Sequence, residues 1–130
     1  MDTSLEALLD RVQERGSFTS RQQAAGAVEN VLVVLGAHLV GDDRTDLARL
    51  LPDRCGDLVG EAEPADQPLS AAEFVDAVAA RTGDDTAGAR RVVTSVLGTL
   101  ADVADDALLR RILTQLPPGH AGLFGRIEPV

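Results

Sequence analysis

The chain contains the same pattern twice, and this repetition limits its fold more than any other feature. Segment 51–60 (LPDRCGDLVG) returns as segment 116–125 (LPPGHAGLFG), with leucine, proline, leucine and glycine at the same spacing. Further upstream, segment 8–15 (LLDRVQER) returns as segment 74–81 (FVDAVAAR), with its apolar residues and final arginine in register. Self-similarity of this kind indicates one supersecondary unit used more than once. We therefore expect two copies of one structural unit.

Each copy has the apolar spacing of three helices followed by a short coda. In the first copy, Leu5, Leu8, Leu9 and Val12 recur at helical spacing. A wider apolar stripe follows over residues 24–39, which is typical of a central, mostly buried helix. The third helix of each copy is expected to stop at a proline, because proline disfavours helical geometry in the residue before it. The codas after these prolines are expected to be short turns or single helical turns folded on the core.

One segment is ambiguous when taken alone. Residues 31–35 (VLVVL) would suit a buried strand, because β-branched residues favour strands. Their counterpart, segment 92–100 (VVTSVLGTL), instead keeps its apolar residues at a helical rather than an alternating period. We therefore predict a helix in both places.

Capping patterns support these helix starts. In a capping box, a hydroxyl-bearing residue is followed three positions later by Glu or Gln. The three pairs are Thr3 with Glu6, Ser20 with Gln23, and Ser70 with Glu73.

The two copies span about 3–60 and 69–125, and an acidic, proline-containing linker, 61–68, joins them. Half of such a chain is marginal as a domain, whereas two packed halves bury a shared core. We predict a single all-α domain over residues 1–130, a six-helix bundle of duplicated three-helix units with an approximate internal two-fold axis.

Charge and composition argue against several classes of partner. The 130 residues include 12 basic and 21 acidic ones, so the net charge is −9 and the surface repels nucleic-acid phosphates and anionic membranes. Aromatic residues make up only 2%, too few for a platform that stacks nucleobases. Every basic residue is arginine, a bias typical of a GC-rich bacterial genome. We expect neither a nucleic-acid nor a membrane partner.

The sequence also indicates a cytoplasmic protein. The single cysteine, Cys55, cannot form an internal disulfide, so nothing points to an oxidising compartment. The first residues lack the basic and apolar regions of a signal peptide. The longest uninterrupted apolar run, 31–35, is far shorter than a membrane span requires.

The pattern resembles a family of uncharacterised bacterial proteins, the domain-of-unknown-function 2267 family. The residues that carry this resemblance are Phe74-Val75-x-x-Val78-x-x-Arg81, Val96-Leu97-x-x-Leu100, and Leu116-Pro117 followed by Leu123-Phe124, with their counterparts in the first copy. The resemblance covers about residues 4–125. It implies an all-helical duplicated domain of undetermined biochemical function, and it assigns no catalytic residue.

Cys55 and His120 occupy the same position of the two copies. If the two codas meet near the two-fold axis, the imidazole would favour the thiolate and create a reactive or redox-sensing cysteine. The alternative is that both residues are tolerated in a loop under weak constraint. His38, near the end of a buried helix, is expected to be a partly buried structural residue rather than a ligand.

No metal or cofactor site is predicted. Two histidines and one cysteine cannot supply the four nitrogen and sulfur ligands of a structural zinc site. The acidic clusters at 42–46, 84–85 and 102–106 lack the spacing of a calcium loop, and each lies at or before a predicted helix start. We expect these carboxylates to cap helices.

Three functions remain open. The first hypothesis is a non-enzymatic protein–protein interaction module, with an unknown basic partner or with self-association. The second is a small-molecule or lipid-binding bundle with its ligand between the two central helices. The third, an enzymatic or redox role, rests only on Cys55 and His120. The two copies also differ: the third helix is aspartate-rich in the first copy and arginine-rich in the second. A specific site is expected first at such differences.

Overall fold

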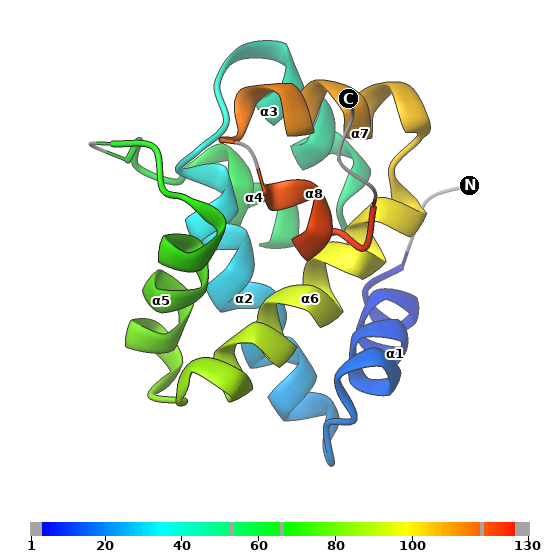
Figure 1. Ribbon diagram of the computed structural model, residues 1–130. Coiled ribbons are helices and arrows are strands. Elements are labelled where there is room, and N and C mark those ends of the chain that lie inside the picture. The colour runs from blue at the N-terminus through cyan, green and yellow to red at the C-terminus, as the bar shows by residue number, and fades with distance from the viewer. Residues whose placement is uncertain (1–3, 53, 66, 118, 127–130) are drawn as a thin grey trace.

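A computed structural model describes residues 4–52, 54–65, 67–117 and 119–126, and within these ranges the chain is all-α, with eight helices and no strand (Figure 1). The prediction of an all-α fold is therefore confirmed, including a helix rather than a strand over 31–35. The helices are α1 (Leu5–Gly16), α2 (Arg21–Gly36), α3 (Gly41–Leu50), α4 (Arg54–Gly60), α5 (Ala71–Thr82), α6 (Thr86–Val103), α7 (Asp106–Gln115) and α8 (His120–Leu123).

The count of six helices was too low, because both codas are helical. The second coda forms a single turn, α8, as expected, but the first forms the longer helix α4. Leu51 and Leu116, which precede the two prolines, have extended backbones with ψ of 145° and 148°. The chain therefore leaves the third helices where the prolines require it, and then resumes helical geometry.

The centre of the molecule is the pair α2 and α6, which contact each other directly. Half of the residues of α2 and more than half of those of α6 are buried, and for α2 this agrees with the wide apolar stripe over residues 24–39. The hydroxyl groups of Ser95 and Thr99 are also buried in α6, and they donate to the carbonyl oxygens of Val92 and Ser95, each at 2.8 Å. These bonds satisfy the hydroxyl groups within the core.

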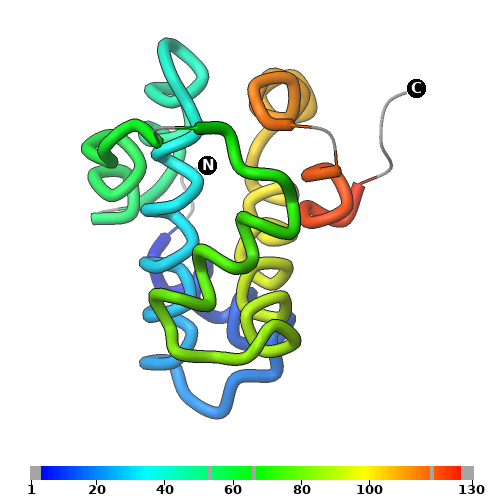
Figure 2. The backbone as a smooth tube through the Cα atoms, turned by 60° about the vertical axis from the view of Figure 1, so that its left-hand side comes forward, coloured from blue at the N-terminus to red at the C-terminus, as the bar shows by residue number. Residues whose placement is uncertain are grey.

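The outer helices cover this pair from both sides (Figures 1 and 2). Helix α1 packs against α2 and α6, and α5 packs against the same two helices. Helix α4 packs on α2 and α3, α8 packs on α6, and α3 contacts α7. One continuous apolar cluster draws side chains from all eight helices.

The predicted caps are largely present. Ser70 and Glu73 form a complete capping box at α5, and Ser20 accepts from the Gln23 N–H at α2. At α1 the cap is Ser4, and Thr3, the predicted cap, lies outside the described residues. Side-chain caps thus fix the starts of α1, α2 and α5 in the described part of the chain.

The linker between the halves is tied to the end of α2. The Ala65 N–H donates to the Ala37 carbonyl oxygen at 2.9 Å. Ala65 lies in the linker, four residues before the second copy begins near residue 69, and Ala37 directly follows α2.

None of the helices in the described part of the chain combines the length and apolar character needed to cross a bilayer.

Candidate functional site

His38 has a structural role that occupies both ring nitrogens. Nδ1 lies 2.8 Å from the Val34 carbonyl oxygen, and Nε2 accepts from the Leu69 N–H at 3.3 Å. A carbonyl can only accept and an N–H can only donate, so the contacts fit a neutral ring with its proton on Nδ1. His38 therefore ties the last turn of α2 to the residue before the α5 cap, and this arrangement leaves no ring nitrogen for a metal.

The structure brings His38 and His120 to the same aromatic ring. Phe74 on α5 is fully buried, and its centroid lies 6.0 Å from that of His38 and 5.6 Å from that of His120. The His120 ring meets Phe74 edge-on at 87°, an arrangement that the charge distribution of aromatic rings favours. His120 Nδ1 also lies 2.9 Å from the Pro117 carbonyl oxygen. The two histidines thus join both halves of the chain through Phe74.

Cys55 lies elsewhere. It is in the first turn of α4 and is only 5% exposed, within the apolar core. Helix α4 lies on the α2 side of the molecule and α8 on the α6 side, so the central pair separates Cys55 from His120 (Figure 2). A reactive thiol needs access to its reaction partner, and the burial of Cys55 restricts that access.

Two of the three acidic clusters supply helix caps. Asp85 accepts from the Gly88 N–H at 2.8 Å, and Asp105 accepts from the Leu108 N–H at 2.7 Å. Asp42 and Asp43 lie in the first turn of α3 without a side-chain cap. Within the described ranges, no three His, Cys, Asp or Glu side chains come together as a metal-binding group.

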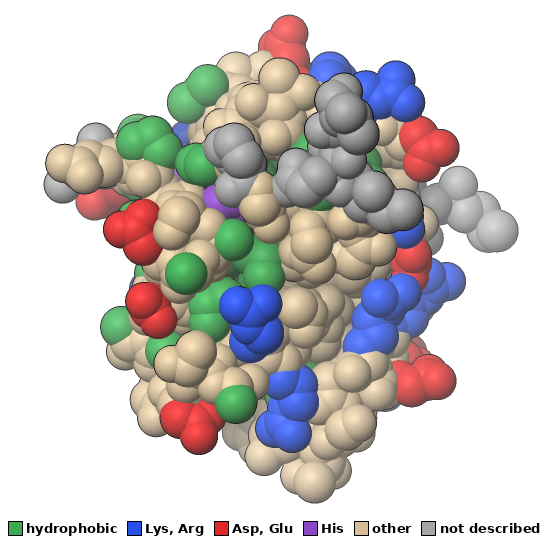
Figure 3. Space-filling view, viewed as in Figure 1, with side chains coloured by type: hydrophobic (Ala, Val, Ile, Leu, Met, Phe, Trp, Pro, Cys, Tyr) green, Lys and Arg blue, Asp and Glu red, His purple; other side chains and the backbone are tan. Residues whose placement is uncertain are grey.

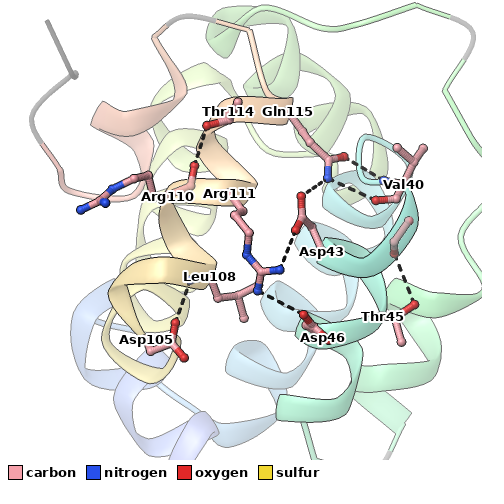
Figure 4. A network of polar contacts seen from close by, with 11 residues as sticks. Val40, Asp43, Thr45, Asp46, Asp105, Leu108, Arg110, Arg111, Thr114 and Gln115 are labelled. Atoms are coloured by element: carbon pink, nitrogen blue, oxygen red, sulfur yellow. Dashed lines mark hydrogen bonds and ion pairs between the residues drawn. The ribbon is translucent and has the colours of Figure 1, made fainter.

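The difference between the two third helices is explained by their contact. Arg111 on α7 lies 3.2 Å from Asp43 and 3.1 Å from Asp46 on α3 (Figure 4). Gln115 donates to Asp43, and its side-chain oxygen accepts from the Val40 N–H at 2.9 Å. The aspartate-rich and arginine-rich helices are therefore complementary partners within one molecule.

An open groove between α2 and α4 combines apolar and acidic side chains. Its floor is formed by Val33, Leu58 and Ala62, each half-buried, and its volume is about 510 Å³. Its acidic side chains, all exposed, are Asp57, Glu61 and Glu63. Arg54 also lines the groove and pairs with Glu29 on α2 at 3.6 Å.

A second depression, between α2, α5 and α6, carries the opposite charge. It has a volume of about 330 Å³ and contains Arg81 from α5 and Arg91 from α6. Figure 3 shows acidic side chains over α5, basic side chains over α6, and both kinds over α1. Charge is therefore distributed unevenly over a chain whose net charge is −9.

Sequence reasoning missed both surfaces. Asp57 and Glu61 are one helical turn apart, and that spacing was a signal that their carboxylates share a face. Arg81 was noted only as a repeated residue, and no local pattern connects it with Arg91.

The fold and these surfaces define a small all-α protein with charged depressions on its described surface. The chain belongs to the family of uncharacterised conserved proteins designated DUF2267, whose family model matches residues 5–123. The suspected resemblance is thereby confirmed. No curated protein is similar enough in sequence to count as a relative.

Proposed function

We propose that the protein is a non-catalytic interaction module that holds a basic helical segment of a partner protein in the groove between α2 and α4. The observation that carries the proposal is the pairing of an apolar floor (Val33, Leu58, Ala62) with three exposed carboxylates. An amphipathic helix docks with its apolar face in such a groove, while its lysine or arginine side chains meet the acidic rim.

The described surface suits a partner that is recognised by its charge better than one that needs a broad apolar interface. Val40, 63% exposed, is the one large apolar side chain that is exposed among the described residues. Obligate dimer interfaces bury extensive apolar area, which the surface of the described residues lacks. A different, basic protein therefore suits the chain better as a partner than a second copy of itself.

The packing favours this function over a ligand held between the central helices. Leu32 and Leu35 on α2 and Leu97 on α6 are fully buried in one cluster, and α2 and α6 contact each other directly. Side chains of this size fill the space that a ligand between the helices would need.

The proposal also includes the internal duplication. Helix α1 packs on α6 as α5 packs on α2, and α3 contacts α7, which is the contact pattern of two units related by an approximate two-fold axis. Duplication would give each half the same scaffold and leave their surfaces free to diverge. A cytoplasmic location is part of the same proposal, supported by the lone, buried Cys55.

The groove can be tested by mapping where a basic helix binds. The probe is a short helical peptide of leucine and lysine with its leucines along one face, titrated into ¹⁵N-labelled protein. We expect the largest amide shift changes at Val33, Leu58 and Ala62. Changes spread evenly over all acidic surfaces, or no saturable binding, would contradict the proposal.

A further inference from the structure

We infer that the depression between α2, α5 and α6 is a binding site for a small organic carboxylate, recognised by Arg81 and Arg91. This site is separate from the groove between α2 and α4, and its charged side chains are mainly basic rather than acidic. The depression has a volume of about 330 Å³, which is at the small end of ligand sites in proteins.

Arg81 is held in position by α2. The Asn30 side-chain amide donates to the Gly26 carbonyl oxygen at 2.9 Å, and its oxygen accepts from Arg81 Nε at 3.1 Å. This chain of two bonds uses only Nε of the guanidinium group. The terminal nitrogens of Arg81 make no hydrogen bond or ion pair with any described residue, so they can bind a carboxylate.

Arg91 is oriented by an aromatic ring. Its guanidinium carbon lies 5.5 Å from the centroid of Phe18, within the range of a cation–π contact. A guanidinium group that lies over a ring donates from its edge, and Arg91 forms no ion pair within the described part of the chain. Both arginines thus keep donors for a ligand and have lost some of their side-chain freedom.

The charge and the walls of the depression define the class of ligand. Two guanidinium groups and one carboxylate, Asp84, line it, so its side chains are net positive. Phe18, Ala27 and Val92 supply apolar wall. A carboxylate on a short aromatic or aliphatic body matches this combination, whereas a nucleic-acid chain would be repelled by the remaining negative surface.

The first test uses 3-phenylpropionate as the probe and its neutral amide as the control. We expect the acid, and not the amide, to shift the amide resonances of Asn30, Arg81 and Val92 in ¹⁵N-labelled protein. Arg81→Gln and Arg91→Gln are each expected to weaken binding about tenfold, because a charge-assisted hydrogen bond is lost. Arg49→Gln, which removes an exposed charge on α3, is the matched control and should leave binding unchanged.

The second test leaves both arginines in place. A Cβ at Gly26 would meet no atom within 4 Å, so Gly26→Leu is expected to keep the fold while its side chain fills the depression. Binding of 3-phenylpropionate should then be lost. The inference is overturned if the amide binds as well as the acid, if Arg49→Gln weakens binding as much as Arg81→Gln, or if Gly26→Leu still binds.

Discussion

Gly36 on α2 lies directly against the backbone of Val59 on α4, and a Cβ at residue 36 would come 2.7 Å from the Val59 carbonyl oxygen. The same Cβ would lie 2.9 Å from the Val59 Cα, so a side chain here requires the two helices to move apart. Glycine at this position therefore fixes how closely α4, and with it one wall of the acidic groove, approaches α2.

We expect Gly36→Ala to lower the free energy of unfolding by about 1–3 kcal/mol, because overpacking forces backbone shifts. Gly26→Ala on the same helix is the control. Its Cβ enters open space, so the better helix propensity of alanine should raise stability by up to about 1 kcal/mol. Urea denaturation measures both variants. Equal effects of the two substitutions would show that the contact with Val59 has no energetic weight.

Phe74→Ala is expected to lower the free energy of unfolding by about 3–5 kcal/mol, since it empties a fully buried site between His38 and His120. Phe74→Leu keeps most of the apolar volume and should cost clearly less. The ring resonances of both histidines should also shift in Phe74→Leu, because the neighbouring ring is gone. Unshifted histidine resonances would contradict the three-ring arrangement.

The α5 capping box gives a prediction about pH. The Ser70 N–H donates to the Glu73 carboxylate at 2.9 Å, and this bond, with a smaller contribution from the Ser70 hydroxyl, lowers the pKa of Glu73. Because the pKa is lower in the folded state than in the unfolded state, the stabilisation is present above the unfolded pKa. It is lost as the pH falls through the folded pKa.

Ser70→Ala removes the smaller of the two contributions and keeps the backbone N–H, so the pKa of Glu73 should rise only part of the way toward its usual value. Separately, loss of the hydroxyl that caps the Glu73 N–H should lower the free energy of unfolding by about 1 kcal/mol. Titration of Glu73 by NMR, with and without the substitution, measures the first effect. A pKa of Glu73 that is unchanged by Ser70→Ala would assign the shift to the backbone bond alone.

The ion pairs between α3 and α7 are partly exposed, so their contribution is expected to be modest. Arg111→Gln should lower the free energy of unfolding by about 0.5–1 kcal/mol at low salt and by less at high salt. Arg110→Gln is the control, because Arg110 lies on the same helix and forms no ion pair within the described part of the chain. If both variants show the same loss in the free energy of unfolding, the ion pairs of Arg111 with Asp43 and Asp46 do not stabilise the fold measurably.

The elements that depend on local chemistry could be predicted from the sequence. The helix over 31–35, the cap at Ser70 and the helix ends before Pro52 and Pro117 follow from periodicity, hydroxyl caps and proline geometry. The seven-residue helix α4 was not predicted, because segment 54–60 contains two glycines, which are poor helix formers.

The basic depression and the ion pairs between α3 and α7 depend on long-range packing, which no local pattern encodes. Arg81 and Asn30 are 51 positions apart in the sequence, and Arg111 and Asp46 are 65 apart. The sequence did indicate that the third helices, α3 and α7, differ in charge. Only the structure shows that they contact each other, which explains the difference. The separation of Cys55 from His120 likewise follows from α4 and α8 packing on different central helices.

The most direct test of the interaction function compares two charge-matched variants in their affinity for the leucine–lysine peptide. One carries Asp57→Asn, Glu61→Gln and Glu63→Gln in the groove, and the other carries Glu6→Gln, Glu14→Gln and Asp76→Asn, all outside it. We predict about tenfold weaker binding for the groove variant, since three rim contacts are lost, and little change for the control. If both variants bind the peptide equally weakly, the affinity depends only on net charge, and a specific site in the groove is contradicted.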